Sequence, residues 1–210
     1  RDMVYTAATT CSVANDMAPD DVSLNYMSLF WIAGENVGLI FPIFTGGTVV
    51  LLARWDALGA MAAIQTHRCT RASMVLDNAV EILDHPEVGQ YAFGSLRATR
   101  VSSFVKKLNP DYRARWLQLT GTVMAEGAWG MTETHTCDTF TTGQQDGNLD
   151  LAGQPVFVGL PVPGTHIKIC SFTTGETLPV GQEGEIVAHS PSLLKAYWNK
   201  PQATAGSLKN

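Results

Sequence analysis

The chain has 210 residues, of which 45% are hydrophobic and 16% are charged, and its net charge is −5 at pH 7. This balance is typical of a globular protein that buries an ordinary core. Nucleic-acid-binding domains usually carry a basic stripe, so the acidic balance excludes nucleic acid as an expected partner. The longest basic cluster, Lys106 and Lys107 with Arg113 and Arg115 nearby, is predicted to be a solvated helix face.

Hydropathy and cysteine usage predict a reduced, cytoplasmic protein without a membrane span. The most apolar run, residues 37–53, is interrupted by Pro42, Gly46 and Gly47, whereas a membrane helix needs about 20 apolar residues. The polar stretch that follows Arg1 is not typical of a signal peptide. The cysteines are far apart and show no metal-ligand spacing. They are Cys11, Cys69, Cys137 and Cys170.

In chain order, the apolar spacing of residues 28–44 predicts a helix that the glycine pair 46–47 ends. The β-branched run 48–53 predicts a buried strand, and Asp56 is predicted to cap a helix that reaches about residue 67. Further strands are predicted at residues 72–76, 96–102 and 122–125, and helices at 78–83 and 110–119. Two short strands, 166–171 and 184–189, are predicted after the chain becomes rich in glycine and proline.

This order predicts an α/β fold in which parallel βαβ layers are followed by a small antiparallel β segment. We expect an α/β portion over residues 1–142 and a β-rich portion over residues 143–210, both within the same domain.

The segment from Gly127 to Thr134 follows a predicted strand, where open α/β sheets bind their ligands. Trp129 offers a flat face to a base, Thr132 a hydroxyl to a phosphate, and Glu133 a hard oxygen ligand to Mg²⁺. The same residues are also typical of a helix start, with Thr132 as N-cap, Glu133 near the helix dipole and Trp129 in the core. Spacing alone favours this second interpretation.

Several segments, taken together and in order, resemble the adenylate-forming (AMP-binding) superfamily of acyl-CoA synthetases, luciferases and peptide-synthetase adenylation domains. Residues 128–134 (AWGMTET) are most similar to the motif of fatty-acyl-CoA synthetases. Matching segments follow at residues 159–164 (GLPVPG), 174–176 (TGE), 181–186 (GQEGEI) and 195–201 (KAYWNKP). Upstream, residues 28–34 and 44–50 resemble the segment that borders the acyl pocket.

The resemblance implies a partial acyl-CoA synthetase-like N-terminal domain and a role for each matching residue. The protein is expected to activate a carboxylic acid, expected to be a fatty acid, with ATP and Mg²⁺, and then to form a thioester with coenzyme A. Thr132 and Glu133 are implied to be catalytic, with Glu133 as the metal ligand. The implied nucleotide contacts are Gly127, Ala128, Trp129, Gly130, Met131, Thr132 and Ser103. The implied acyl-pocket residues are Phe30, Trp31, Gly34 and Phe104.

The chain also departs from the family pattern. Phe104 follows Ser102 and Ser103 in a turn where family members carry small residues, and Trp31 stands where many carry histidine. The family's phosphate loop ending in Pro-Lys-Gly is absent, as is the Gly-Trp-x-x-Thr-Gly-Asp segment expected beyond Asn210. We therefore expect an internal fragment of the large N-terminal domain that is inactive alone, with the coenzyme A site outside this chain.

Two alternatives remain open. A fatty-acyl-AMP ligase or a peptide-synthetase adenylation domain would share this core and pass the acyl group to a carrier protein. A degenerate, non-catalytic binding module would account for Phe104 in the substrate turn. The identity of the acid and the formation of a homo-oligomer also remain open.

Overall fold

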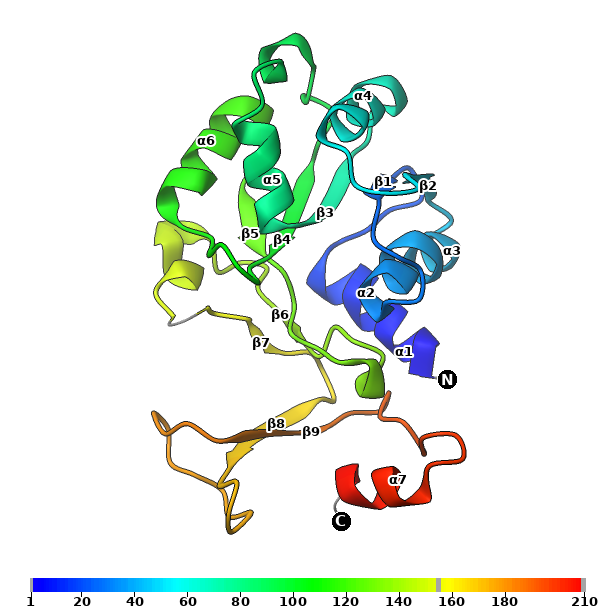
Figure 1. Cartoon of the computed structure of the whole chain (residues 1–210), viewed down its shortest axis with the longest axis vertical. Coiled ribbons are helices and arrows are strands. Elements are labelled where there is room, and N and C mark those ends of the chain that lie inside the picture. The colour runs from blue at the N-terminus through cyan, green and yellow to red at the C-terminus, as the bar shows by residue number, and fades with distance from the viewer. Residues whose placement is uncertain (1, 154–155, 209–210) are drawn as a thin grey trace.

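The centre of the molecule is a five-stranded parallel sheet in the order β2-β1-β3-β4-β5 (Figure 1). It is seen in a computed structural model that describes residues 2–153 and 156–208. The strands are β1 (Val22–Asn25), β2 (Thr48–Leu51), β3 (Arg71–Val75), β4 (Ala98–Ser102) and β5 (Met124–Glu126). Strands alternate with helices from β2 to β5, which confirms the predicted α/β fold with parallel βαβ layers.

Helices cover both faces of this sheet (Figure 1), as parallel sheets require. One face packs against α4 (Ala57–His67), α5 (Leu76–Leu83) and α6 (Pro110–Thr120). The other face carries α1 (Asp2–Ala8), the π-helical turn η1 (Thr9–Ala14), and the continuous run α2 (Ile32–Glu35), η2 (Asn36–Ile40) and α3 (Phe41–Thr45). The larger core lies on the first face, where Met61, Ile64 and Trp116 are fully buried.

Local signals place several helix ends where the sequence predicts them. The Asp56 carboxylate accepts a hydrogen bond from the backbone nitrogen of Gly59 at 2.7 Å and so caps α4. Helix α6 begins at Pro110 and ends at Gly121, which adopts the left-handed conformation (φ 76°) that favours glycine. The predicted helix over residues 28–44 instead begins at Ile32, because the backbone of Trp31 is extended.

Two elements near the N-terminus, β1 and the α1–η1 helix, are not predicted by the sequence. Strand β1 has only four residues, two of them polar, yet it pairs with β2 on one side and β3 on the other. Its polar Ser23 and Asn25 are buried. A short strand of this composition has no distinctive period, so only its neighbours in the sheet define it.

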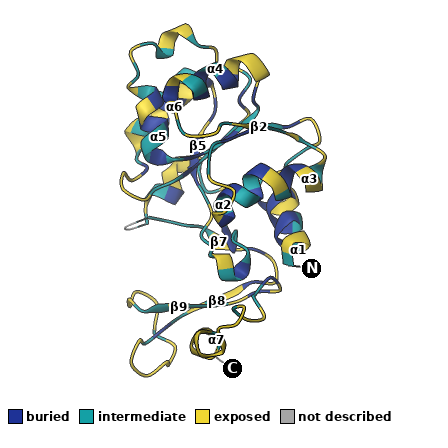
Figure 2. Ribbon diagram, turned by 45° about the vertical axis from the view of Figure 1, so that its right-hand side comes forward, coloured by how far each residue is buried: buried dark blue, intermediate teal, exposed yellow. Residues whose placement is uncertain are grey.

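Most of the remaining chain lies below the parallel sheet in Figure 1 and forms two small antiparallel pairs, of which the sequence predicts the one between residues 166–170 and 185–189. Strand β8 (His166–Cys170) pairs with β9 (Glu185–His189), and β6 (Thr139–Phe140) pairs with β7 (Leu160–Pro161). Figure 2 shows that the β8–β9 hairpin and α7 (Pro201–Ser207) are largely exposed or half-buried. The short turns are η3 (Val88–Gln90), η4 (Thr132–Thr134) and η5 (Asp146–Leu151).

The prediction of a solvated basic helix face is wrong in two respects. Lys106 and Lys107 are exposed but lie before α6 and in no helix, and Arg113 is buried. Arg113, on α6, has a buried guanidinium that forms an ion pair with Asp150 at 2.5 Å. Arg115, on the same helix, is more exposed and pairs with Asp84. The side of α6 that carries Arg113 faces the segment around η5, and the sequence gives no sign of that contact. Within residues 2–153 and 156–208, no helix has the length and apolarity needed to cross a bilayer.

Candidate active site

A loop of unusual backbone geometry follows β5 at the carboxyl edge of the sheet. It contains the single turn η4, after which His135, Thr136 and Cys137 all adopt left-handed conformations, with φ of 61°, 55° and 56°. Each such residue costs on the order of 1–3 kcal/mol, and strain of this kind clusters at active and ligand-binding sites. We call residues 127–138 the carboxyl-edge loop.

Hydrogen bonds hold the carboxyl-edge loop in this conformation. Trp129 donates its backbone N–H to the Thr139 hydroxyl at 2.8 Å, and its carbonyl accepts from the N–H of Asp138 at 2.9 Å. Asn36, from the helices on the other side, donates its Nδ2 to the carbonyl of His135 at 3.0 Å. Gly130 is required for this close packing, because an added Cβ would lie 2.5 Å from the backbone nitrogen of Cys137.

The structure corrects the interpretation of residues 127–134 as a helix start. Thr132 does not cap a helix, because η4 is one short 3-10 turn whose N-cap is Met131, without a side-chain cap hydrogen bond. The Thr132 side chain is exposed, and Trp129 is half-buried instead of lying in the core.

Glu133 is partly exposed and is held by the chain that leads to α7. Its Oε1 accepts a hydrogen bond from the Tyr197 hydroxyl at 2.6 Å, and its carbonyl accepts from the N–H of Leu194 at 2.6 Å. Mg²⁺ in nucleotide sites is usually held by one or two carboxylates together with phosphate oxygens. One reachable carboxylate beside an exposed hydroxyl, that of Thr132, therefore fits a metal that is bound mainly through its nucleotide.

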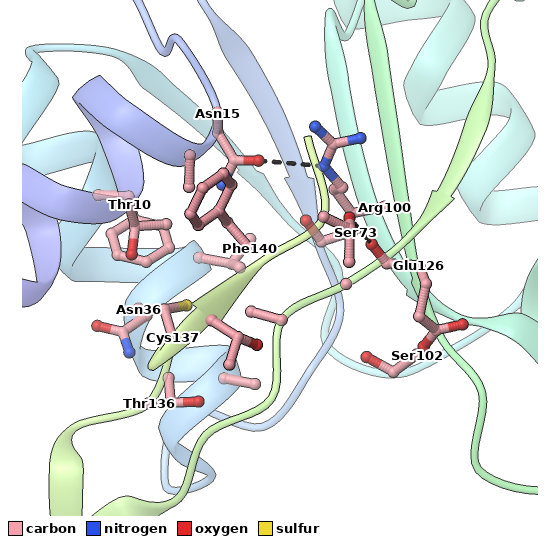
Figure 3. A pocket seen from close by; sticks show the side chains of 18 of the residues that line it. Thr10, Asn15, Asn36, Ser73, Arg100, Ser102, Glu126, Thr136, Cys137 and Phe140 are labelled. Atoms are coloured by element: carbon pink, nitrogen blue, oxygen red, sulfur yellow. Dashed lines mark hydrogen bonds between the residues drawn. The ribbon is translucent and has the colours of Figure 1, made fainter. Parts of the chain in front are cut away.

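A cavity of about 120 Å³ lies between the carboxyl-edge loop, the sheet and helices η1 to α3 (Figure 3). Of the predicted nucleotide contacts, Gly127 and Ala128 line this cavity. The others lie outside its wall; they are Trp129, Gly130, Met131, Thr132 and Ser103. The structure thus brings part of the predicted site to the cavity and keeps the remainder along the same loop or on the adjacent turn.

The predicted acyl-pocket residues lie beside the cavity wall and not in it. Trp31 and Phe104 contact each other, with ring centroids 6.1 Å apart and ring planes 51° apart. Phe30 is 95% exposed. Gly34 is buried, and an added Cβ there would lie 2.3 Å from the carbonyl oxygen of Ser28. The wall is formed instead by neighbours on the same helical run, Ala33, Asn36, Val37 and Phe41.

Glu126 is a site residue that the sequence analysis did not identify. It ends β5, is 5% exposed, and accepts hydrogen bonds from the Ser103 N–H at 2.9 Å and the Ser103 hydroxyl at 2.5 Å. Burial raises the pKa of this carboxyl, while the bonds from Ser103 and the charge of Lys107 oppose the rise. Ser103, predicted to contact the nucleotide, therefore has its hydroxyl engaged by Glu126 in this structure.

The buried carboxyl of Asp138 should make the stability of the protein depend on pH. Its carboxyl is 1% exposed, and burial raises its pKa from 3.8 to about 6, opposed by a hydrogen bond from Thr134. Because the folded state binds this proton more tightly than the unfolded state, the free energy of unfolding should fall as pH rises from about 4 through 6. It should stay lower above pH 6, by on the order of 2–3 kcal/mol.

The check is the unfolding free energy of wild type and Asp138→Asn between pH 4 and 8. The variant should lack this contribution, so that its advantage over wild type grows from near zero at pH 4 to its full size at pH 7. Parallel pH profiles would contradict the assignment. The raised pKa of Glu126 acts in the same direction in both proteins and cancels in the comparison.

The fold and the carboxyl-edge loop together define a nucleotide-binding class, and comparison with known proteins identifies it. Residues 1–198 match the family of AMP-binding enzymes, and the chain belongs to that family. The long-chain-fatty-acid–CoA ligase of Bacillus subtilis (strain 168) is 28% identical over 189 residues, which are 89% of this chain and 32% of the ligase. The feruloyl-CoA synthase of an Amycolatopsis species is 28% identical over 202 residues, 94% of this chain and 38% of the synthase.

Solved structures share the same fold. ATP-bound MatB from Rhodopseudomonas palustris superposes with a TM-score of 0.78 at 24% identity, covering 100% of this chain and 39% of MatB. The anthranilate–CoA ligase AuaEII in complex with anthranoyl-AMP superposes with a TM-score of 0.81 at 21% identity, covering 98% of this chain and 38% of the ligase. The chain thus spans about a third of the length of the curated relatives it matches.

Proposed function

We propose that the whole protein is an AMP-forming acid–thiol ligase, which joins a carboxylic acid to ATP and then passes the acyl group to coenzyme A. The observation that carries this proposal is the strained carboxyl-edge loop, with its Trp-Gly-Met-Thr-Glu sequence, at the carboxyl ends of the strands of an AMP-binding fold. The relatives reported above are ligases or synthases of CoA esters, which supports coenzyme A as the acceptor.

The first step joins two anions. A carboxylate oxygen of the acid forms a bond to the α-phosphorus of ATP, the bond from that phosphorus to the bridging oxygen breaks, and pyrophosphate leaves. Repulsion opposes the approach, so the protein must position both substrates and neutralise their charge. A bound Mg²⁺ would supply neutralisation between phosphate oxygens. In the second step the thiol attacks the acyl carbon and AMP leaves.

In this proposal each residue of the carboxyl-edge loop has a separate role in binding the substrates. Trp129 packs against the nucleoside, and the exposed Thr132 hydroxyl donates to an oxygen of the α-phosphate. Glu133 holds the metal. Gly127 and Ala128 allow the backbone to approach the reacting carboxylate, because they carry little or no side chain where the loop meets the cavity.

The comparisons support a carboxylic acid as the substrate but do not define which class of acid it is. The AWGMTET sequence favours a fatty acid, whereas the relatives include both a long-chain-fatty-acid ligase and a feruloyl-CoA synthase. A fatty acid is therefore one candidate substrate among carboxylic acids. The size and charge of the cavity are a further source of information on the acid.

Acid-dependent exchange of pyrophosphate into ATP tests the first step. We expect the whole protein to catalyse exchange when a suitable acid is present and not when the acid is omitted, and the isolated 210-residue chain not to catalyse it. Thiol acceptor assays would then compare coenzyme A with a carrier protein. ATP binding by the whole protein, without exchange for any acid of a broad panel, would overturn the proposal in favour of a non-catalytic module.

A further inference from the structure

Arg100 is a cation of the cavity wall that pairs with no carboxylate of the described residues. It lies on β4 and donates its Nε to the Asn15 side-chain oxygen at 3.1 Å and its Nη2 to the Thr142 hydroxyl at 2.9 Å. Both partners are neutral. Nη1 makes no hydrogen bond within residues 2–153 and 156–208, and no acidic residue in that range forms an ion pair with Arg100.

The surroundings of Arg100 leave its positive charge uncompensated. Burial lowers the pKa of its guanidinium, Arg71 lowers it further, and the charge of Asp150 acts against both. Asp150 is already paired with Arg113 at 2.5 Å, and Asp21 is shared by Arg71 and another arginine. An anion that enters the cavity would therefore meet a partly desolvated guanidinium, and it would not have to displace a carboxylate of the protein to bind it.

The only other charged residue lining this cavity in the described part of the chain, Glu126, does not serve as that partner. Its carboxylate is bonded to Ser103, and in Figure 3 it points toward the Ser102 side, away from the cavity interior. The guanidinium of Arg100 lies at the Asn15 end (Figure 3). The reacting edge of the cavity and its cationic end are therefore distinct.

The cavity is small, and its mostly apolar wall carries a few polar side chains, among them those of Arg100 and Ser102. A water-sized group needs about 10–15 Å³, so a cavity of about 120 Å³ has room for roughly ten of them. The Thr10 hydroxyl is buried in this wall beside the thiol of Cys137. Ser102 and Arg100 are two residues apart on β4, which separates their backbones by about 7 Å. This size favours a short acid over a long aliphatic chain, and the cation of Arg100 favours one that carries a second negative charge.

We propose that the acid substrate carries a second carboxylate, which Arg100 binds at the inner end of the cavity while the first carboxylate reacts at the carboxyl-edge loop. This inference rests on the proposed function and names its substrate class, a short α,ω-dicarboxylic acid. A guanidinium suits this role because its planar fork matches a carboxylate. The hydrogen bonds from Arg100 to the uncharged side chains of Asn15 and Thr142 hold the guanidinium in its orientation.

The test compares succinate, glutarate and adipate with butyrate, valerate and hexanoate in pyrophosphate exchange by the whole protein. At least one dicarboxylic acid should exceed the monocarboxylic acid of equal length in kcat/KM by about 10- to 100-fold, the effect expected of a hydrogen bond to a charged group. The substitution Arg100→Gln should remove that preference through the KM of the dicarboxylic acid and leave the monocarboxylic acids nearly unchanged. A preference for the monocarboxylic acid in the wild-type protein would overturn the inference.

A control and a second readout separate the possible failures. Arg97→Gln removes a half-exposed guanidinium just before β4 that pairs with Asp20 and Asp21, and it should leave the substrate preference unchanged. If Arg100→Gln does not fold, the wild-type acid panel still decides the matter. Calorimetry of dicarboxylate binding without ATP is independent of turnover. Dicarboxylate binding without exchange would refute the proposed function alone, whereas exchange with no dicarboxylate preference would refute the present inference alone.

Discussion

Replacing Glu133 by glutamine in the whole protein is expected to slow adenylate formation by about 100-fold, the scale on which one preorganised electrostatic group contributes to catalysis. The physical reason is the loss of the accessible negative charge that Glu133 offers to a metal beside the exposed Thr132; the loop's other carboxyl, Asp138, is buried. The loss should be greatest at limiting Mg²⁺ and should shrink as Mg²⁺ is raised. The measurement is the rate of pyrophosphate exchange over a series of Mg²⁺ concentrations.

Tyr197→Phe is the matched control for Glu133. It removes the hydroxyl that donates to Glu133 Oε1 at 2.6 Å and leaves the carboxylate charge in place. We expect this variant to keep its Mg²⁺ dependence close to that of the wild type. If both variants lost activity equally and at every Mg²⁺ concentration, Glu133 would serve to anchor the chain around Leu194 and Tyr197 and would not hold a metal.

Breaking the Arg113–Asp150 pair should cost about 3–5 kcal/mol of unfolding free energy, because one buried charge would be left without its partner. The pair is bidentate, with Nη1 and Nη2 donating to the two carboxylate oxygens at 2.9 and 2.5 Å, and both side chains are buried. Arg113 also donates Nε to the carbonyl of Met124 in β5. Asp150→Asn, followed by urea unfolding, measures the loss.

Two further variants decide how that loss is to be interpreted. Arg115 lies two residues after Arg113 on α6 and therefore on nearly the opposite side of the helix. Arg115→Ala breaks a solvent-exposed pair with Asp84 and should shift the urea midpoint little. The double variant Arg113→Met with Asp150→Leu should recover much of the stability lost in Asp150→Asn, because it removes both charges from the interior. Equal midpoints for Asp150→Asn and wild type would show that the pair does not bear on stability.

Local sequence signals predicted most of the sheet. The β-branched run at β2, the Asp56 cap of α4 and the Pro110 start and Gly121 end of α6 act within a few residues, so they can be interpreted without the fold. Strand β1 was not predicted, because its four residues form a strand only by pairing with β2 and β3, which lie further along the chain. The same applies to Arg113, whose burial depends on Asp150 and Asn148 from a distant loop.

The candidate site was predicted in part. The motif lies in the loop after β5, as expected of a glycine-rich segment at the end of a parallel strand, and Gly127 and Ala128 from it line the cavity; its role in binding stays a prediction. It did not indicate Arg100, Glu126 or Asn36, since strand and helix residues of this kind usually face solvent or a partner. Their roles arise where three separate segments enclose a cavity.

By itself, the sequence determined the alternation of strands and helices from β2 to β5 and the residue types of the carboxyl-edge loop, because both depend on periodicity and composition within short windows. Only the tertiary structure decided which polar side chains are buried together, as with Arg113 and Asp150, and which cation pairs with no carboxylate among the described residues, as with Arg100. Burial makes such pairings energetically decisive, and burial is a property of contacts between segments that the linear sequence does not display.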